Sequence, residues 1–340
     1  MAMRRWLRRI ALGVVALLAL VLVVGVGYEL LGRRRAARDY PPAGKLVDIG
    51  GRKMQLDCRG TGTPTVVFEA GLDVGGSLSW SAVHDSVAKS TRACAYSRAG
   101  IMWSDPHKGP QTGKTVAEDL HATLIAAGEH APFVLVGHSL GGPYIMTYTK
   151  YFGSEVAGLV FVDASHPDQV ARLREVTPVT VNGALRTVKI LAAFSWAGVV
   201  RAATASQEGV RNEPPAAAHA TAAYTSTSLA AMLKEAEALD TTLAEAGTFR
   251  QLADRPVFVL TAAAPLPAAA LQAMKMTPAQ GKRQAEIWGE MQDDEARWSS
   301  RSQHQRVTDA THYIQFDRPD IVIAAVRSVV DSVRRGAGGS

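Results

Sequence analysis

A serine lies between glycines in the segment GHSLGG, residues 137–142, directly after the apolar run 133–136. A stretch with helical amphipathicity follows it. A serine at a sharp strand-to-helix turn projects its hydroxyl above the edge of a sheet, and the glycines avoid collisions with the neighbouring strand and helix. The alternative is a small residue at a purely structural turn. The strand-turn-helix context favours Ser139 as a nucleophile.

A serine hydroxyl is a weak nucleophile and needs a base. Of the nine histidines, His312 is the preferred base, because it follows the last expected strand and precedes the closing helix. Loops at the carboxyl edge of a parallel sheet gather ligand-facing residues. His304 precedes that strand and is expected to point away from this edge. His138 is expected to pack or to hydrogen-bond locally, and His166 to line either the pocket or a surface loop.

A carboxylate should orient the histidine, and the expected chain order is Ser…Asp…His. Asp163 ends an apolar segment at the same sheet edge and is the preferred acid, with Asp168 as a weaker alternative. Asp293 and Asp294 lie deep in a helical stretch. The segment directly after the strand at 257–261, where an acid is usual, contains none.

The oxyanion that forms when a carbonyl is attacked needs two backbone donors. The N–H of Leu140, directly after the serine, is one candidate. The loop EAGLDVGG, residues 69–76, follows an apolar segment and offers the N–H of Leu72 as the other. Gly71 lets this backbone approach the serine closely, because glycine has no side chain.

Short apolar segments alternate with helix-like segments and predict the elements that position these residues. The helix-like stretches are residues 79–90, 115–127 and 140–152, and an opening strand pair is expected at 45–50 and 53–58. This alternation predicts an α/β fold with a parallel sheet. The apolar segments, typical of strands buried on both faces, are residues 64–71, 92–98, 132–138, 156–163 and 255–262.

Two longer segments break the alternation. Residues 167–255 are Ala-rich with no convincing strand, and a helical cap between two sheet strands is expected there. Residues 263–302 separate the strand at 257–261 from a last strand near 305–308. A closing helix is expected at 318–335, with a proline in its first turn, followed by a disordered tail at 336–340.

The N-terminal region contains a 22-residue apolar run, Ile10–Leu31, bracketed by arginines. About 20 helical residues cross a bilayer, whereas the apolar region of a cleaved signal peptide is about 7–15 residues long. Residues 1–32 are therefore expected to form a single-pass membrane anchor, followed by a linker at 33–44. The short N-terminal flank favours that end inside the cell and the bulk of the chain exported.

The charge of the chain is concentrated at this anchor. The formal net charge is +6, but residues 1–38 hold eight arginines and one acid, and residues 39–340 hold 29 basic and 30 acidic residues. A nearly neutral folded part gives no support to nucleic-acid binding. No Cys/His/carboxylate cluster has metal-ligand spacing, so neither a metal nor an organic cofactor is expected.

The combined motifs resemble the α/β-hydrolase fold superfamily over residues 45–335, in its serine-hydrolase members. AGLDVGG resembles the oxyanion loop, GHSLGG the nucleophile elbow and THYIQFDRPDIV the histidine loop with its closing helix. TRACAYSRAGIMWSDP resembles the Tyr-Asp-Arg-x-Gly-x-Gly-x-Ser segment, with Ser97 in place of the aspartate. The resemblance implies a mostly parallel eight-stranded sheet with helices on both faces and a cap after the sixth strand.

The resemblance also bears on the acid and on the two cysteines. The missing acid after the seventh strand departs from the family pattern, but pancreatic-type lipases carry it after the sixth, in a context similar to VDASHP, which supports Asp163. The family sheet order places the second and fourth strands side by side, so Cys58 and Cys94 could form a disulfide, in agreement with export. Two buried thiols are the alternative.

These features together predict a membrane-anchored serine hydrolase that cleaves carboxylic esters, or less readily amides, through an acyl-enzyme. A serine at the elbow argues against epoxide hydrolase and haloalkane dehalogenase chemistry, whose relatives use a carboxylate nucleophile there. Aminopeptidase-like or cofactor-free haloperoxidase-like activity stays open, as does a non-catalytic membrane-tethered binding protein. The expected partner is a small acyl or lipid-like substrate. The oligomeric state is undetermined.

Overall fold

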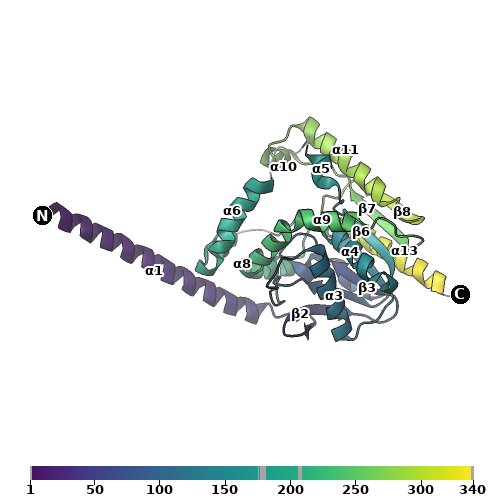
Figure 1. Cartoon of the computed structure of the whole chain (residues 1–340), viewed down its shortest axis with the longest axis horizontal. Coiled ribbons are helices and arrows are strands. Elements are labelled where there is room, and N and C mark those ends of the chain that lie inside the picture. The colour runs from purple at the N-terminus through teal and green to yellow at the C-terminus, as the bar shows by residue number, and fades with distance from the viewer. Residues whose placement is uncertain (1, 175, 177–180, 206–208, 338–340) are drawn as a thin grey trace.

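An eight-stranded sheet forms the centre of the computed structural model, which describes residues 2–174, 176, 181–205 and 209–337 (Figure 1). Its order is β1-β2-β4-β3-β5-β6-β7-β8. The β1–β2 and β2–β4 pairs are antiparallel and the other five are parallel, so the expected mostly parallel sheet is confirmed. The strands are β1 (Lys45–Asp48), β2 (Lys53–Arg59), β3 (Thr65–Glu69), β4 (Ala93–Ser97), β5 (Phe133–His138), β6 (Val156–Val162), β7 (Pro256–Ala262) and β8 (Arg301–Val307).

Helices cover both faces of this sheet. Alternate residues of each buried strand supply the two cores; in β3, Val67 faces one core and Val66 and Phe68 face the other, as the alternation of side chains along a strand requires. Residues 79–90, expected as one helix, contain the end of one short helical turn and the whole of a second short helix, separated by residues 81–83. The packed helices are α3 (Gly113–Ala127) and α4 (Gly141–Phe152) on one face, and η1 (Gly76–Trp80), α2 (His84–Ala88) and α13 (Pro319–Ala337) on the other.

The described residues of the two insertions form helices and turns, and residues 175, 177–180 and 206–208 of the expected cap lie outside the described residues. β8 begins at Arg301, before the expected residue 305. The prediction was late because the polar sequence RSQHQR, typical of an exposed edge strand, carries no apolar signal. A short helix, α12 (Ile314–Asp317), follows it, and η2 (Gly153–Glu155) precedes β6. Between β6 and β7 lie α5 (Gln169–Leu173), α6 (Val181–Ala193), η3 (Ser195–Ala197), α7 (Val199–Thr204), α8 (Pro215–Glu237) and α9 (Leu239–Gly247), and between β7 and β8 lie α10 (Ala268–Ala273) and α11 (Pro278–Glu295).

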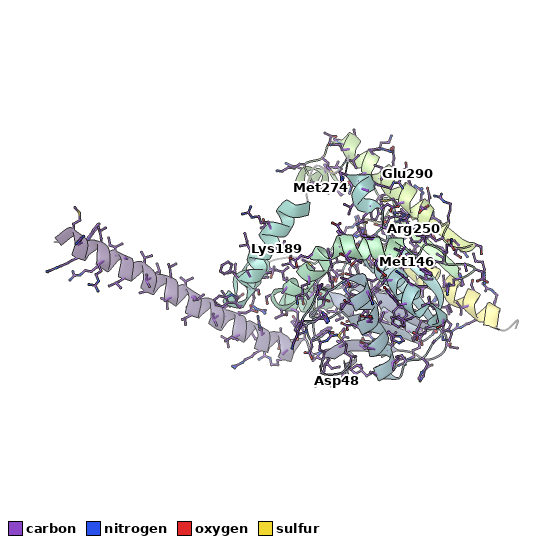
Figure 2. The ribbon with its side chains drawn as sticks, viewed as in Figure 1. Asp48, Met146, Lys189, Arg250, Met274 and Glu290 are labelled. Atoms are coloured by element: carbon purple, nitrogen blue, oxygen red, sulfur yellow. A yellow bond between two sulfur atoms is a disulfide. The ribbon has the colours of Figure 1, made fainter. Side chains whose placement is uncertain are left out.

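The N-terminal helix α1 (Ala2–Asp39) leaves the body as one long rod (Figure 1). Along its N-terminal part the side chains project on all sides, free of the rest of the chain (Figure 2). Its most apolar stretch has no buried residue, so α1 is not a core helix. Residues 33–39, expected as linker, are helical, and Pro41 follows the helix end.

The C-terminal helix also runs past its expected end. α13 continues to Ala337, so residues 336 and 337, expected in a disordered tail, are helical. Residues 338–340 lie outside the described residues.

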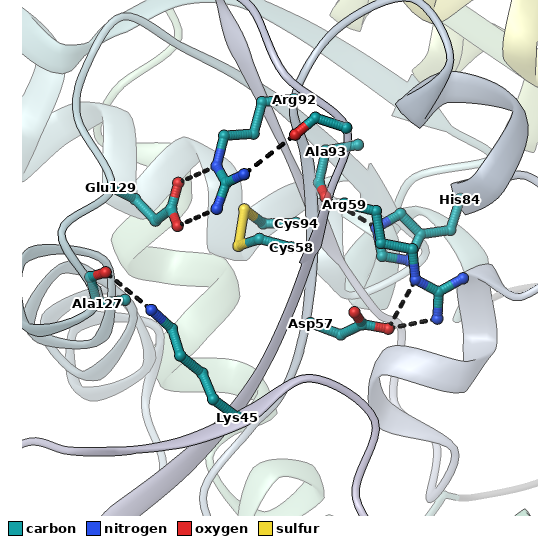
Figure 3. The surroundings of a disulfide bond; sticks show 11 residues. Lys45, Asp57, Cys58, Arg59, His84, Arg92, Ala93, Cys94, Ala127 and Glu129 are labelled. Carbon is teal, nitrogen blue, oxygen red and sulfur yellow. Dashed lines mark hydrogen bonds and ion pairs between the residues drawn. A yellow bond between two sulfur atoms is a disulfide. The ribbon is translucent and has the colours of Figure 1, made fainter.

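The two cysteines lie opposite each other on β2 and β4. Cys58 and Cys94 are register partners and form a disulfide with an S–S distance of 2.05 Å (Figure 3). Beside it, Arg92 donates two hydrogen bonds to Glu129, at 2.5 and 2.6 Å. The described residues contain no free cysteine.

Candidate active site

The serine of the elbow lies between the end of β5 at His138 and the start of α4 at Gly141. Ser139 has a φ of 53°, in the left-handed region that side chains rarely adopt. A Cβ at Gly137 would lie 2.5 Å from the carbonyl oxygen of Gly141, and a Cβ at Gly141 would lie 2.4 Å from that of Glu69. Neither position can therefore accept a side chain, and the half-buried serine occupies the apex of the turn.

The candidate acid and the candidate base form a direct pair. Asp163 Oδ2 accepts a hydrogen bond of 2.6 Å from His312 Nδ1. The other oxygen, Oδ1, accepts from the Ala262 N–H at 2.9 Å and from Trp288 Nε1 at 2.8 Å. Both carboxylate oxygens are thus held, and Nε2 of His312 is left as its free basic nitrogen.

Strand register brings the acid to the elbow. β5 and β6 pair His138 with Val162, so Ser139 and Asp163 directly follow partner residues. Asp163 also has a positive φ, 44°. The hydrogen bonds of His312 in the described part of the chain do not include one to Ser139 Oγ. Such a bond is often long in an enzyme without substrate.

His138 supports the loop that carries the base. Its Nε2 donates to the carbonyl oxygen of His312 at 2.9 Å, and the two ring centres lie 4.7 Å apart. Burial, together with the nearby His312, holds the pKa of His138 well below its usual value. His138 is therefore neutral, with its proton on Nε2, and it acts through the position of the His312 backbone.

The other groups considered for the triad have partners of their own. Each is paired at a distance of 2.7–3.1 Å with a group outside the Asp163–His312 pair. None of these three pairs contributes to the Asp163–His312 pair. The pairs are His304 with Asp293, His166 with Asp294, and Asp168 with Arg250.

The loop after β3 lies against the elbow. A Cβ at Gly71 would come within 3.0 Å of Ser139 Cβ. Among the described residues, the backbone N–H groups of Leu72 and Leu140 have no hydrogen-bond partner. Their side chains belong to one apolar cluster with Leu243 of the cap helix α9. Two free N–H groups beside a serine are the donors that an oxyanion hole requires.

Arg98 is the main residue of the candidate site that the sequence did not reveal. It is 3% exposed and donates to the carbonyl oxygens of Ala70 and Gly71, at 2.8 and 2.6 Å. It also pairs with Glu69 at 2.7 Å and with Glu235 of α8 at 2.8 Å. Arg98 thereby joins the backbone of the loop after β3 to helix α8. Its place in the SRAG segment, within a family-like motif, was the available signal.

Trp288 is the second such residue. It lies on α11, 125 positions after the Asp163 that it binds, and no local pattern links the two. The segment after β7 lacks an acid, but Ala262, the last residue of β7, contributes its backbone N–H to the same carboxylate. The end of β7 therefore supplies a hydrogen-bond donor to the carboxylate of Asp163, at the position where the family pattern usually has the acid itself.

Two other features of the described residues do not belong to this site. A cavity of about 810 Å³ lies between α1 and the cap, and Ser139, Asp163 and His312 do not line it. The one cluster of potential metal ligands within the described residues is Cys58, Cys94 and Glu129. Its sulfurs are joined in the disulfide, so this cluster does not form a metal centre.

Curated proteins match parts of the chain. "Probable transporter efuK" of Hormonema carpetanum is 35% identical over 130 residues, which are 35% of this chain and 18% of that protein. "Uncharacterized protein YbdG" of Bacillus subtilis is 26% identical over 159 residues, 46% of this chain and 49% of that protein. The chain thus spans less than half the length of these relatives.

Solved structures match nearly all of the chain. A thermophilic esterase from Thermogutta terrifontis covers 85% of this chain and 98% of its own, with 18% identity and a TM-score of 0.58. The enol-lactonase from Burkholderia xenovorans covers 84% and 100%, with 17% identity and a TM-score of 0.57. At 17–18% identity, these two similarities show a shared fold alone. The family model described as "alpha/beta hydrolase fold" matches residues 64–319, and the chain belongs to that family.

Proposed function

We propose that this protein is a serine hydrolase that cleaves carboxylic esters through an acyl-enzyme. The observation that carries the proposal is the 2.6 Å hydrogen bond between His312 Nδ1 and Asp163, whose second oxygen is held by two further donors. An aspartate in this position fixes the imidazole with Nε2 unprotonated, the tautomer that a general base needs. Ser139 at the elbow is the group that such a base would activate.

The reaction would proceed in two halves. Ser139 Oγ attacks the ester carbonyl as His312 Nε2 takes its proton, and the N–H groups of Leu72 and Leu140 stabilise the oxyanion. The C–O bond to the alcohol breaks as His312 returns the proton to the leaving oxygen. Water then attacks the acyl-enzyme as His312 Nε2 takes its proton, and the bond to Ser139 Oγ breaks as His312 returns that proton to Oγ, which releases the carboxylic acid. Asp163 stabilises the imidazolium in both halves.

A membrane-tethered binding protein is the second candidate, and the carboxylate at His312 distinguishes the two. A scaffold used only for binding has no need for an acid that orients a histidine beside an elbow serine. Amidase or haloperoxidase-like chemistry would use the same three residues. A panel of esters and amides separates esterase from amidase activity, and halide oxidation in the presence of hydrogen peroxide and a carboxylic acid reports haloperoxidase-like activity.

The apolar helix α1 supports a single-pass anchor, and the Cys58–Cys94 disulfide supports a catalytic domain on the oxidising, extracytoplasmic side. An ester with an apolar acyl chain is the substrate class that suits an enzyme held at a membrane. We include both in the proposal.

A fluorophosphonate probe tests the proposal on the full-length protein in detergent. We expect covalent labelling of Ser139, located by mass spectrometry, and its loss in Ser139→Ala and His312→Ala. Ser165→Ala is the matched control, because this neighbouring serine contacts Ser139 only through its backbone N–H, which the substitution keeps. Folded wild-type protein that takes no label would favour the binding protein instead.

A further inference from the structure

The cap exposes a concentrated group of large apolar side chains. Ile190, Phe194, Trp196 and Val199 are 55%, 51%, 49% and 43% exposed, at the end of α6, in η3 and at the start of α7. We call these four residues the cap apolar patch. Outside α1, no other segment of that length in the described residues exposes more than one large apolar side chain. Exposed apolar surface of this kind marks an interaction site.

The cap apolar patch lies where the cap contacts α1. A Cβ at Gly25 would lie 2.4 Å from the carbonyl oxygen of Ala197, and a Cβ at Gly198 would lie 2.6 Å from that of Gly25. The two backbones therefore touch, and Figure 1 shows α6 running toward α1 at this level. The contact joins the patch to the longest apolar surface of the molecule.

The level of this contact along α1 identifies what covers the patch. Gly25 precedes the end of the apolar run, Leu31, by six residues, which at 1.5 Å per residue is roughly 9 Å along the helix axis. If the run spans a bilayer, the patch lies just inside the boundary between headgroups and acyl chains. Amphipathic elements at membrane surfaces bury their apolar side by about 5–10 Å at this boundary, and tryptophan is enriched there.

A buried ion pair fixes that level. Glu29, 1% exposed, lies within the apolar run and pairs with Arg33 at 2.7 Å and with Arg201 of the cap at 2.9 Å. Ser226 of α8 donates to the same carboxylate at 2.9 Å. An unpaired carboxylate near lipid is unfavourable, so the cap must stay where Arg201 reaches Glu29.

The charges around the patch suit a lipid surface. Arg34 and Arg35 are exposed directly after the apolar run, and Arg186 is exposed on α6. Lys189, labelled in Figure 2, lies on the same helix and pairs with Glu237 at 2.9 Å. Basic side chains near a membrane surface attract anionic headgroups.

We propose that the cap apolar patch docks on the phospholipid surface of the membrane that α1 crosses. This inference rests on the proposed membrane anchoring by α1. The cap, and with it the cavity between α1 and the cap, is then held against the lipid headgroups, on the side from which an amphiphilic ester arrives.

Site-specific quenching tests the inference on the full-length protein in nanodiscs of phosphatidylcholine and phosphatidylglycerol. A bimane fluorophore is placed at Phe194→Cys or Trp196→Cys, since both native cysteines are in the disulfide. Nitroxide-labelled phospholipids should quench each label by roughly half, because a group at the interfacial depth contacts the acyl chains. The matched control is Ile125→Cys on α3, a helix packed on one face of the sheet; this position is 62% exposed and should keep its emission.

A label at Leu18→Cys separates failure of the inference from failure of the anchoring. Leu18 lies in the middle of the apolar run and should be strongly quenched if α1 spans the bilayer. Quenching at Leu18 without quenching at Phe194 or Trp196 would leave the anchor in place and overturn the docking of the cap. No quenching at Leu18 would overturn both.

Discussion

The two sides of the nucleophile elbow are held by opposite kinds of interaction. On the β4 side, the buried Arg98 guanidinium joins two carboxylates and two carbonyl oxygens and holds the loop after β3. On the β7 side, Asp163 is held by an indole N–H and a backbone N–H, both neutral, and by His312. The charged groups that hold the loop, Arg98 and its carboxylates, are thus separate from Asp163 and His312, the pair that would support proton transfer.

This separation has a physical basis. A buried ion is tolerated where opposite charges and hydrogen bonds compensate it, and Arg98 meets that condition with Glu69 and Glu235. Burial still raises the pKa of Glu69 to about 7, in spite of the opposing charge of Arg98. Asp163 is instead positioned by two neutral donors, with no permanent cation beside it. Its negative charge is therefore available to stabilise a protonated His312.

The largest effect is expected for Asp163→Asn. The asparagine oxygen can keep the bonds from Ala262 and Trp288, which turns its NH₂ group toward His312 Nδ1 and forces the proton onto Nε2. His312 is then no longer a base, and we expect kcat/KM for an ester to fall about 10⁴-fold, with an unfolding free energy within about 1 kcal/mol of wild type. Steady-state kinetics and urea unfolding measure the two quantities.

The control for that variant is Asp293→Asn, which removes an acid paired with His304 outside the site. It should leave kcat/KM unchanged. A large loss in Asp293→Asn, or full activity in Asp163→Asn, would move the acid of the triad away from Asp163.

For Arg98→Met we expect the opposite of Asp163→Asn, namely a large loss of unfolding free energy. The substitution leaves Glu69 and Glu235 buried without their cation, and breaking a buried ion pair in this way costs about 3–5 kcal/mol. Urea unfolding measures the loss. Adding Glu69→Gln and Glu235→Gln to Arg98→Met should recover much of it, because the uncompensated charges are removed. A triple variant as unstable as Arg98→Met alone would mean that the hydrogen bonds to Ala70 and Gly71, not the charges, hold this side.

The same contrast explains what the sequence could predict. Ser139 and His312 are predicted by local patterns, because an elbow and a loop before the closing helix are built from neighbouring residues. The parallel sheet is predictable for the same reason, whereas the polar edge strand β8 carried no apolar signal and was expected too late. Arg98 and Trp288 act on groups far away in sequence, with side chains whose contacts only the folded sheet defines.

The smallest effect concerns a third buried acid, Glu295, on the Asp163 side. It is 1% exposed, and neither carboxyl oxygen has a hydrogen-bond partner in the described residues. Burial, aided by the negative charge of Asp163, raises its pKa well above the usual value. The unfolded chain releases this proton near pH 4.5, but the folded chain keeps it, so the contribution of Glu295 to stability declines as pH rises above that value.

Glu295→Gln cannot titrate and removes this decline. We expect its unfolding free energy, relative to wild type, to be higher at pH 8 than at pH 5, because only the wild-type chain loses stability through this group as pH rises. Glu290→Gln, a half-exposed position on the same helix, is the control and should show no such trend. Equal differences at both pH values would mean that Glu295 ionises normally. A neutral Glu295 adds no second negative charge beside Asp163. Glu295→Gln should therefore also leave the pH profile of kcat/KM unchanged, because Asp163 alone supplies the negative charge opposite His312.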